Sequence, residues 1–317
     1  MSAPTVRSRF DPVIMAAVDA LWRQWAAVGG SASAGATAHC IIDPEAMVLA
    51  SSALTPREAR LRQVMDDWLR AHADVLSVQR LSNMAGTAPT LPHHDLASIA
   101  RVAMHGVNGH RWKKLADSSP SGVSSRPTRS SPGALRLTTP ATAMLRLRLG
   151  MGVGVKADAT AYLLGTSGWS SVQEVTKATG YTVAAVRRGL DELAQARFIE
   201  SEEPHDWQSR RGRHFHAEPK AWRHLLDTGA TPPSWGYFRE RYNFVVHVSQ
   251  WLYEGNAEQR WDDVQLGDWG RRWMEQHPLA FRFGTEDRAA YRGKLSDWAA
   301  HFTASLDRLR LWFEEEA

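Results

Sequence analysis

The stretch S170-S-V-Q-E-V-T-K-A-T-G-Y-T-V-A-A-V-R-R-G-L-D-E-L-A-Q-A-R-F-I-E200 decides the fold that we expect for this chain. Ser171 lies three residues before Glu174, which is the spacing of a capping box at the start of a helix. Gly180 is placed to end that short helix, because glycine adopts the left-handed backbone at little cost. Thr182 is then placed to cap a longer helix. The stretch therefore predicts two helices joined by a tight turn.

The residues on either side extend this pattern. Before it, residues 155–164 carry apolar side chains at helical spacing, and after it, residues 198–217 read as strand, turn and strand. Three helices followed by a β-hairpin make a winged helix-turn-helix. The buried stripe of its third helix is expected to consist of Val183, Val186, Leu190 and Leu193.

Such an arrangement suits double-stranded DNA. The leading end of the third helix would enter the major groove, where small side chains allow close approach and arginines reach guanine edges or phosphates. Arginines at the tip of the hairpin would contact the backbone. The candidate DNA-binding residues are Ser171, Thr182, Val183, Ala185, Arg187, Arg188, Arg210, Arg211 and Arg213. The alternative is a small helical domain whose Arg187 and Arg188 are merely solvated surface.

The segment T179-G-Y-T-V-A-A-V-R-R-G-L-D-E-L-A-Q-A-R-F-I-E200 resembles the recognition-helix region of bacterial winged-helix transcriptional regulators, the broad MarR/ArsR/GntR-like group. The resemblance implies a protein that binds operator DNA as a homodimer and responds to a ligand, a protein partner or another signal. It covers only the central part of the chain. A long N-terminal region and a Trp-rich C-terminal region lie outside it.

The expected fold class is mainly α, with four regions along the chain. Residues 1–116 are predicted to form an N-terminal helical domain, and residues 117–134 a flexible linker dominated by Ser, Pro and Gly. Residues 135–218 hold the winged helix-turn-helix DNA-binding domain. Residues 219–317 form a Trp-rich helical region that we expect to dimerise.

Helix boundaries outside the central segment rest on proline and on apolar periods. Proline is favoured at the first position of a helix, and three residue pairs therefore mark expected helix starts: Asp11-Pro12, Asp43-Pro44 and Thr55-Pro56. In the C-terminal region, residues 235–253 read as one long helix and residues 287–315 as another.

Composition sets broad limits on function. The chain has 317 residues, a net charge of +4 and a hydrophobic fraction of 43%, and this mild positive charge is compatible with nucleic acid without requiring it. The single cysteine, Cys40, excludes an internal disulfide and suits a reducing compartment. No apolar run reaches the length of a membrane span. We therefore expect a cytoplasmic protein without membrane contact.

Signs of enzymatic or metal chemistry are weak. No nucleophile elbow, zinc-protease, P-loop or kinase pattern occurs, and G150-M-G-V-G154 lacks the spacing of a dinucleotide loop. His214 and His216 share one face of a strand, but nothing completes a ligand set around them. The expectation is no enzyme activity, no metal and no cofactor. Arg146 and Arg148 are further candidates for phosphate contact.

The function hypothesis is a sequence-specific transcriptional regulator that binds double-stranded DNA as a homodimer and acts as a repressor. Two alternatives remain open. One is an antitoxin-like or partner-binding protein whose helical regions hold another polypeptide; D43-P-E-A and S77-V-Q-R-L resemble stretches of regulators encoded near nucleotidyltransferase-like toxins. The other is a small-molecule sensor, in which the tryptophans after residue 218 line an aromatic effector pocket rather than a core or dimer seam.

Overall fold

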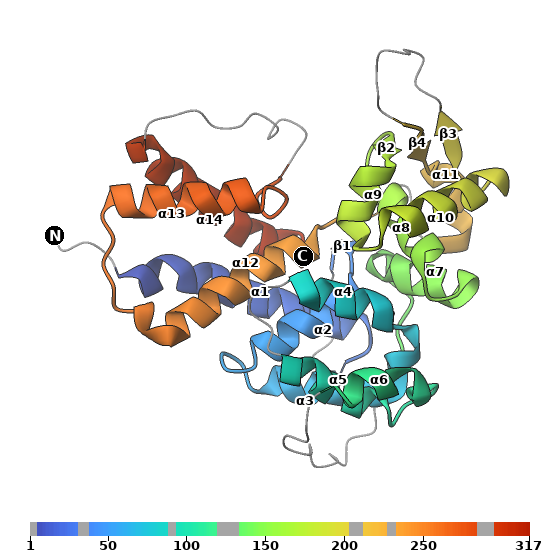
Figure 1. The fold of residues 1–317 in the computed structure, drawn as a ribbon, viewed down its shortest axis with the longest axis horizontal. Coiled ribbons are helices and arrows are strands. Elements are labelled where there is room, and N and C mark those ends of the chain that lie inside the picture. Colours follow the sequence, from blue (N-terminus) through green and yellow to red (C-terminus); the bar gives the residue numbers. More distant parts are fainter. Residues whose placement is uncertain are drawn as a thin grey trace.

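The computed structural model describes residues 5–30, 38–87, 93–118, 133–202, 212–226, 233–283 and 295–317. In these residues the fold is mainly helical, as the sequence predicts, with fourteen α-helices and five short strands. The elements pack into two groups, each with its own apolar core (Figure 1). Among the helices of the described ranges, none combines the length and the apolar composition needed to cross a membrane.

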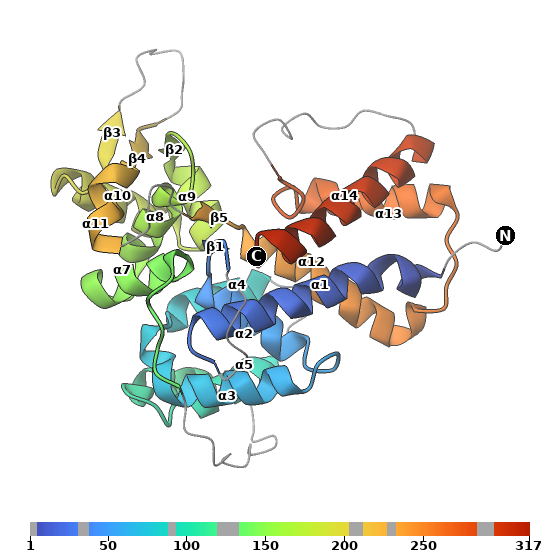
Figure 2. The same cartoon turned by 180° about the vertical axis from the view of Figure 1, so that it is seen from behind.

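The larger group, which we call the helical body, combines helices from both ends of the chain. Figure 2 shows α1 running beside α12 and α14. Phe10 of α1 lies at the centre of this packing, in ring contact with Phe244 of α12 and with Trp269 and Phe302 of the last two helices. The helices of the body are α1 (Val6–Ala27), α2 (Pro44–Ala53), α3 (Arg60–His72), α4 (Val78–Thr87), α5 (His93–Ala103), α6 (Lys113–Ala116), α12 (Phe238–Trp251), α13 (Asp263–Gln276) and α14 (Leu295–Glu315).

The smaller group, which we call the central unit, lies at one side of the helical body (Figure 1). Its core gathers apolar side chains from all five of its helices together with Phe215, which is 1% exposed. Its helices are α7 (Ala143–Met151), α8 (Val155–Leu164), α9 (Val172–Thr179), α10 (Val183–Gln195) and α11 (Pro219–Leu226). Its strands are β2 (Ser170–Ser171), β3 (Glu200–Glu202) and β4 (His214–His216).

A short parallel pair of strands joins the two groups. Strand β1 (Cys40–Ile41) pairs with β5 (Ser234–Trp235). Ile41 belongs to the core of the central unit although its neighbour Cys40 belongs to the core of the helical body. The backbone N–H of Trp235 also donates to the carbonyl of Gly165 at 2.6 Å. The two strands therefore lie where the two cores meet.

Two of the three proline-based helix starts are wrong. Helix α1 begins at Val6, where Thr5 accepts a hydrogen bond from the Ser8 N–H, and Pro12 lies inside the helix. Val6 and Phe10, both 0% exposed, are buried in the core, so the residues before Pro12 also become part of the helix.

The Thr55-Pro56 pair does not start α3 either. The Thr55 hydroxyl donates back to the Ser51 carbonyl of α2 at 3.0 Å, and α3 begins only at Arg60. The third start is confirmed, because Asp43 accepts from the Ala46 N–H at 3.1 Å and Pro44 begins α2.

The predicted helix over residues 235–253 is wrong at its beginning. Trp235 lies in β5, and the following Tyr237 has a left-handed backbone with φ of 48°. Helix α12 therefore starts at Phe238 and ends at Trp251, where a π-helical turn, Leu252–Asn256, follows. The predicted last helix corresponds to α14, which begins at Leu295 in the described residues.

Candidate nucleic-acid interface

The strands of the central unit form one small antiparallel sheet in the order β2-β4-β3. Ser171 of β2 and Glu202 of β3 pair with the same residue, His214, from opposite sides. In chain order the unit runs α8, β2, α9, α10, β3 and β4. The hairpin made by β3 and β4 therefore follows directly after the α9–α10 pair.

The predicted caps of α9 and α10 are confirmed. The Ser171 hydroxyl accepts from the Glu174 N–H at 3.3 Å, and the Glu174 carboxylate accepts from the Ser171 N–H at 2.9 Å. Gly180 ends α9 with φ of 75°, and Thr182 caps α10 by accepting from the Ala185 N–H. The Ser171 side chain is thus occupied within the protein.

Helix α10 has one buried and one exposed face. Val186, Leu190 and Leu193 are at most 2% exposed, as predicted. Gly189 shares this face and brings α10 close to α8, because a Cβ there would lie 3.0 Å from Val155. The prediction that Val183 is buried is wrong. It is 46% exposed, since the first turn of α10 projects beyond the core.

The exposed face gathers most of the predicted DNA-binding residues of this helix at its leading end. Ala185 is half-buried, whereas the other members of the face are exposed. The face carries two guanidinium groups, one hydroxyl and small apolar side chains, and no carboxylate comes from its first two turns. Its exposed members are Thr182, Val183, Ala184, Arg187 and Arg188.

The hairpin arginines are only partly described. Arg210 and Arg211 lie outside the described residues. Arg213 is held within the central unit, because its guanidinium donates to Asp191 of α10 and to Ser201 of β3, each at 2.8 Å. The same guanidinium lies over the ring of Phe215. Arg213 therefore ties the hairpin to α10.

A buried ionic cluster lies between the central unit and the helical body. Arg80 of α4 pairs with Asp43 and Glu45, and Arg148 of α7 pairs with Glu45 and Asp158. The side chains of these five residues are at most 3% exposed. Arg148 contacts both carboxylates through two oxygens each, at 2.7–2.8 Å. We call this group the ionic cluster.

Mutual pairing keeps the ionic cluster charged despite its burial. Burial alone raises the pKa of Glu45, but Arg148 and Arg80 outweigh it and lower the pKa to about 2. Burial likewise lowers the pKa of Arg80, but the carboxylates of Asp43 and Glu45 outweigh it, so the pKa lies above its ordinary value. Glu45 therefore takes part in the cluster as a carboxylate ion rather than as a neutral acid.

The ionic cluster reaches the turn before α10. The Tyr181 hydroxyl donates to Asp158 at 2.9 Å, and Nε of Arg80 donates to the Thr179 carbonyl at 2.6 Å. Asn83 donates to the next carbonyl, that of Gly180, at 3.2 Å. Arg239 of α12 donates to the Lys177 carbonyl at 2.6 Å. The helical body thus holds the α9–α10 turn by its carbonyl groups and fixes how α10 is presented.

The sequence did not predict this cluster, and one of its members lies elsewhere than expected. Arg148 was expected to face phosphate, but it is buried against Glu45 and Asp158 because α7 packs between the two cores. Arg146 instead donates to the carbonyls of Leu225 and Leu226 in α11. The signal in the sequence was a charged residue among leucines, but one of its two partners, Glu45, lies 103 residues away.

No group of three or more histidine, cysteine, aspartate or glutamate side chains within the described ranges is arranged to hold a metal ion. Comparison with protein-family models, with curated proteins and with solved structures finds no match to this chain.

Proposed function

We propose that the central unit is a winged helix-turn-helix and that the protein is a sequence-specific regulator of transcription that binds double-stranded DNA. One observation carries the proposal. The leading end of α10 is exposed and carries Arg187 and Arg188, while the preceding turn at Gly180 and the following β-hairpin hold it in place. A helix presented in this way matches how helix-turn-helix proteins enter the major groove.

In the proposed complex, the first two turns of α10 lie in the major groove. Arg187 and Arg188 reach guanine edges or phosphates, and Thr182 donates to a base or phosphate oxygen. The exposure of Val183 also has a reason in this arrangement. Its methyl groups are available for apolar contact with the methyl group of a thymine, which only the major groove presents.

The hairpin supplies a second contact to the duplex. Arg210 and Arg211 fall between β3 and β4 in the sequence, and we propose that they meet backbone phosphates beside the groove that α10 occupies. Arg213 has a different part in the proposal. Because it is bonded to Asp191 and Ser201, it sets the angle between the hairpin and α10.

The proposal includes a homodimer that represses by occupying a promoter. A single helix contacts only a few base pairs. A two-fold dimer doubles the number of base pairs that are contacted when the DNA site is palindromic. Two copies of the central unit would then lie one helical turn of DNA, or a multiple of it, apart.

Capture from genomic DNA tests the proposal directly. The purified full chain is incubated with sheared DNA of its source genome at physiological salt, and the bound fragments are recovered and sequenced. We expect enrichment of a small number of fragments that share one palindromic site, which footprinting then delimits. Recovery of all fragments in equal proportion, or of none, rejects a sequence-specific regulator.

A further inference from the structure

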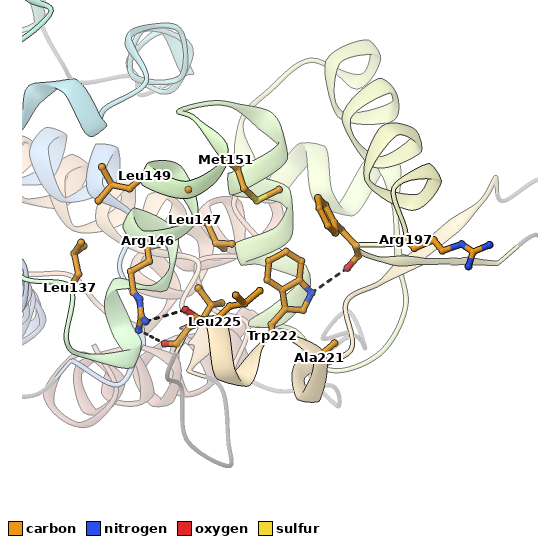
Figure 3. Close-up of a pocket in the computed structure, with 12 residues that line it drawn as sticks. Leu137, Arg146, Leu147, Leu149, Met151, Arg197, Ala221, Trp222 and Leu225 are labelled. Carbon is orange, nitrogen blue, oxygen red and sulfur yellow. Dashed lines mark hydrogen bonds between the residues drawn. The ribbon is translucent and has the colours of Figure 1, made fainter.

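A pocket of about 540 Å³ opens on the central unit, between α7, the end of α10 and α11 (Figure 3). Its floor is made of side chains that are almost completely buried: Leu147, Trp222 and Leu226. Its rim is unusual for a protein surface, because three large apolar side chains there remain exposed. Leu149 is 53%, Phe198 52% and Leu225 70% exposed.

The polar groups of the lining already have partners or turn away. The Arg146 guanidinium donates to the carbonyls of Leu225 and Leu226, and the Trp222 indole N–H donates to the Phe198 carbonyl at 3.2 Å. Figure 3 shows the Arg197 side chain directed away from the other lining residues. A molecule bound here would therefore contact mainly apolar side chains and few polar groups that are available for a hydrogen bond.

We propose that this pocket binds a flat, uncharged, apolar molecule of two or three aromatic rings. Its volume lies within the range of small-molecule sites. Its aromatic walls suit planar ligands, because the rings of Phe198 and Trp222 lie 6.0 Å apart at 70° and offer an edge and a face. A charged ligand is disfavoured, since it would lose its hydration without gaining a free ionic partner.

The pocket is connected to the helix that we propose to read DNA. Arg197 has a left-handed backbone with φ of 59°, and the N–H of Phe198 donates to the Leu193 carbonyl at 3.0 Å, which closes the last turn of α10. A ligand that presses on Phe198 acts on this turn and on β3 beyond it. Ligand occupancy therefore changes DNA affinity, and by linkage DNA changes ligand affinity. This second step rests on the proposed function.

The probe for the test is N-phenyl-1-naphthylamine, an uncharged aromatic dye whose emission rises in apolar surroundings. It is titrated into the full chain without DNA, and we expect one saturable site with a Kd on the order of 10 μM. Gly150→Phe is the blocking variant. Gly150 lines the pocket, and a Cβ there meets nothing within 4 Å, so a phenyl ring can be added without displacing the backbone, and we expect it to fill part of the pocket.

Gly86→Phe is the matched control. Gly86 lies on α4, outside the pocket, and its added Cβ also meets nothing within 4 Å. We expect about tenfold weaker dye binding in Gly150→Phe and native binding in Gly86→Phe. Absence of a saturable site, or equal binding by both variants, overturns the pocket.

Self-association is the competing explanation for the apolar rim, and sedimentation velocity decides it. If Leu225→Asp converts a dimer into a monomer and only the monomer takes up the dye, the rim is an interface between copies and the ligand proposal is overturned. A dye-dependent change in DNA affinity supports the link to α10. Site-specific dye binding by a protein that selects no DNA supports the pocket and rejects the regulator.

Discussion

Nε of Arg80 donates to the backbone carbonyl of Thr179 across 2.6 Å, and this bond joins the helical body to the last residue of α9. The same guanidinium pairs with Asp43 and Glu45, and all three side chains are buried. One side chain thus satisfies two carboxylates at the start of α2 and the turn that precedes α10. The arrangement makes the stability of the body and the placement of α10 depend on the same contacts.

Arg80→Met should reduce the free energy of unfolding by about 3–5 kcal/mol, because it leaves the buried Asp43 carboxylate without its guanidinium partner and removes one of the two guanidinium groups that pair with Glu45. Chemical denaturation followed by circular dichroism measures the change. Arg60→Met is the control, since Arg60 pairs with Glu58 at the surface and its side chain is 76% exposed. The control should leave the unfolding midpoint nearly unchanged. If Arg80→Met changed the free energy of unfolding as little as the control does, Arg80 would add nothing to stability.

Acid should weaken the fold through Glu45. Its pKa is about 2 in the folded protein against an ordinary value of 4.5, because Arg148 and Arg80 outweigh the opposing effect of burial. A lowered folded pKa gives stability that is complete above the unfolded value and is lost as the pH falls through the folded value. We expect a loss of roughly 3 kcal/mol between about pH 5 and pH 2 from this group.

Unfolding free energies measured across that range, in the native chain and in Glu45→Gln, isolate this contribution. The comparison is needed because burial raises the pKa of Glu240 and of Asp66, which act in the opposite direction. Glu45→Gln should be less stable than the native chain near pH 6. Below pH 5 its free energy of unfolding should change less with pH than that of the native chain. If the unfolding free energies of the two chains changed with pH in parallel, the acid sensitivity would belong to groups other than Glu45.

Packing between α13 and α14 should depend on one glycine. A Cβ at Gly270 would lie 2.4 Å from the ring of Phe302, which is itself 0% exposed. Gly270→Ala should therefore cost about 1–3 kcal/mol of stability. Gly86→Ala should do the opposite, because its Cβ meets nothing and alanine favours a helix by about 0.5–1 kcal/mol. Thermal unfolding measures both changes: the unfolding temperature should fall in Gly270→Ala and rise in Gly86→Ala.

The features that could be predicted from sequence depend on residues only a few positions apart. The Ser171–Glu174 capping box, the left-handed Gly180 and the Thr182 cap are all of this kind. Each is set by backbone hydrogen bonds that the adjoining residues themselves complete. The mainly helical fold class follows from the same local preferences.

Features that depend on distant partners could not be predicted. Pro12 has a strong local preference for a helix start, yet the burial of Phe10 extends the helix before it. Arg148 follows an apolar run at the sequence level, and nothing nearby indicates that Glu45 is its partner. The candidate interface could be predicted because the residues that cap its helices are neighbours in sequence. The ionic cluster that holds the interface could not, because its residues join four helices, α2, α4, α7 and α8.

If α10 reads DNA, Arg188→Ala should weaken binding to the captured site by about 1–3 kcal/mol and relax the preference at one base pair. Arg188 is exposed on the second turn of α10, so its removal should not affect folding. Arg272→Ala on α13 removes the same charge far from the central unit and serves as the control. Electrophoretic mobility shifts on a panel of single-base variants of the site measure both effects. Equal affinities of the two variants on every site would reject the assignment.

Arg213 offers the sharpest test of how the hairpin works. If it positions the hairpin through Asp191, then Arg213→Ala and Asp191→Ala should weaken binding to all sequences by similar factors, and the double variant should be no worse than either. The dependence of affinity on salt should fall by the same amount in both single variants, because a displaced hairpin loses the phosphate contacts proposed for Arg210 and Arg211. Asp263→Ala on α13 controls for the loss of a negative charge. A direct phosphate contact by Arg213 predicts a different result for Asp191→Ala: it would tighten binding and leave the salt slope in place, whereas Arg213→Ala alone would reduce the slope, by about 1.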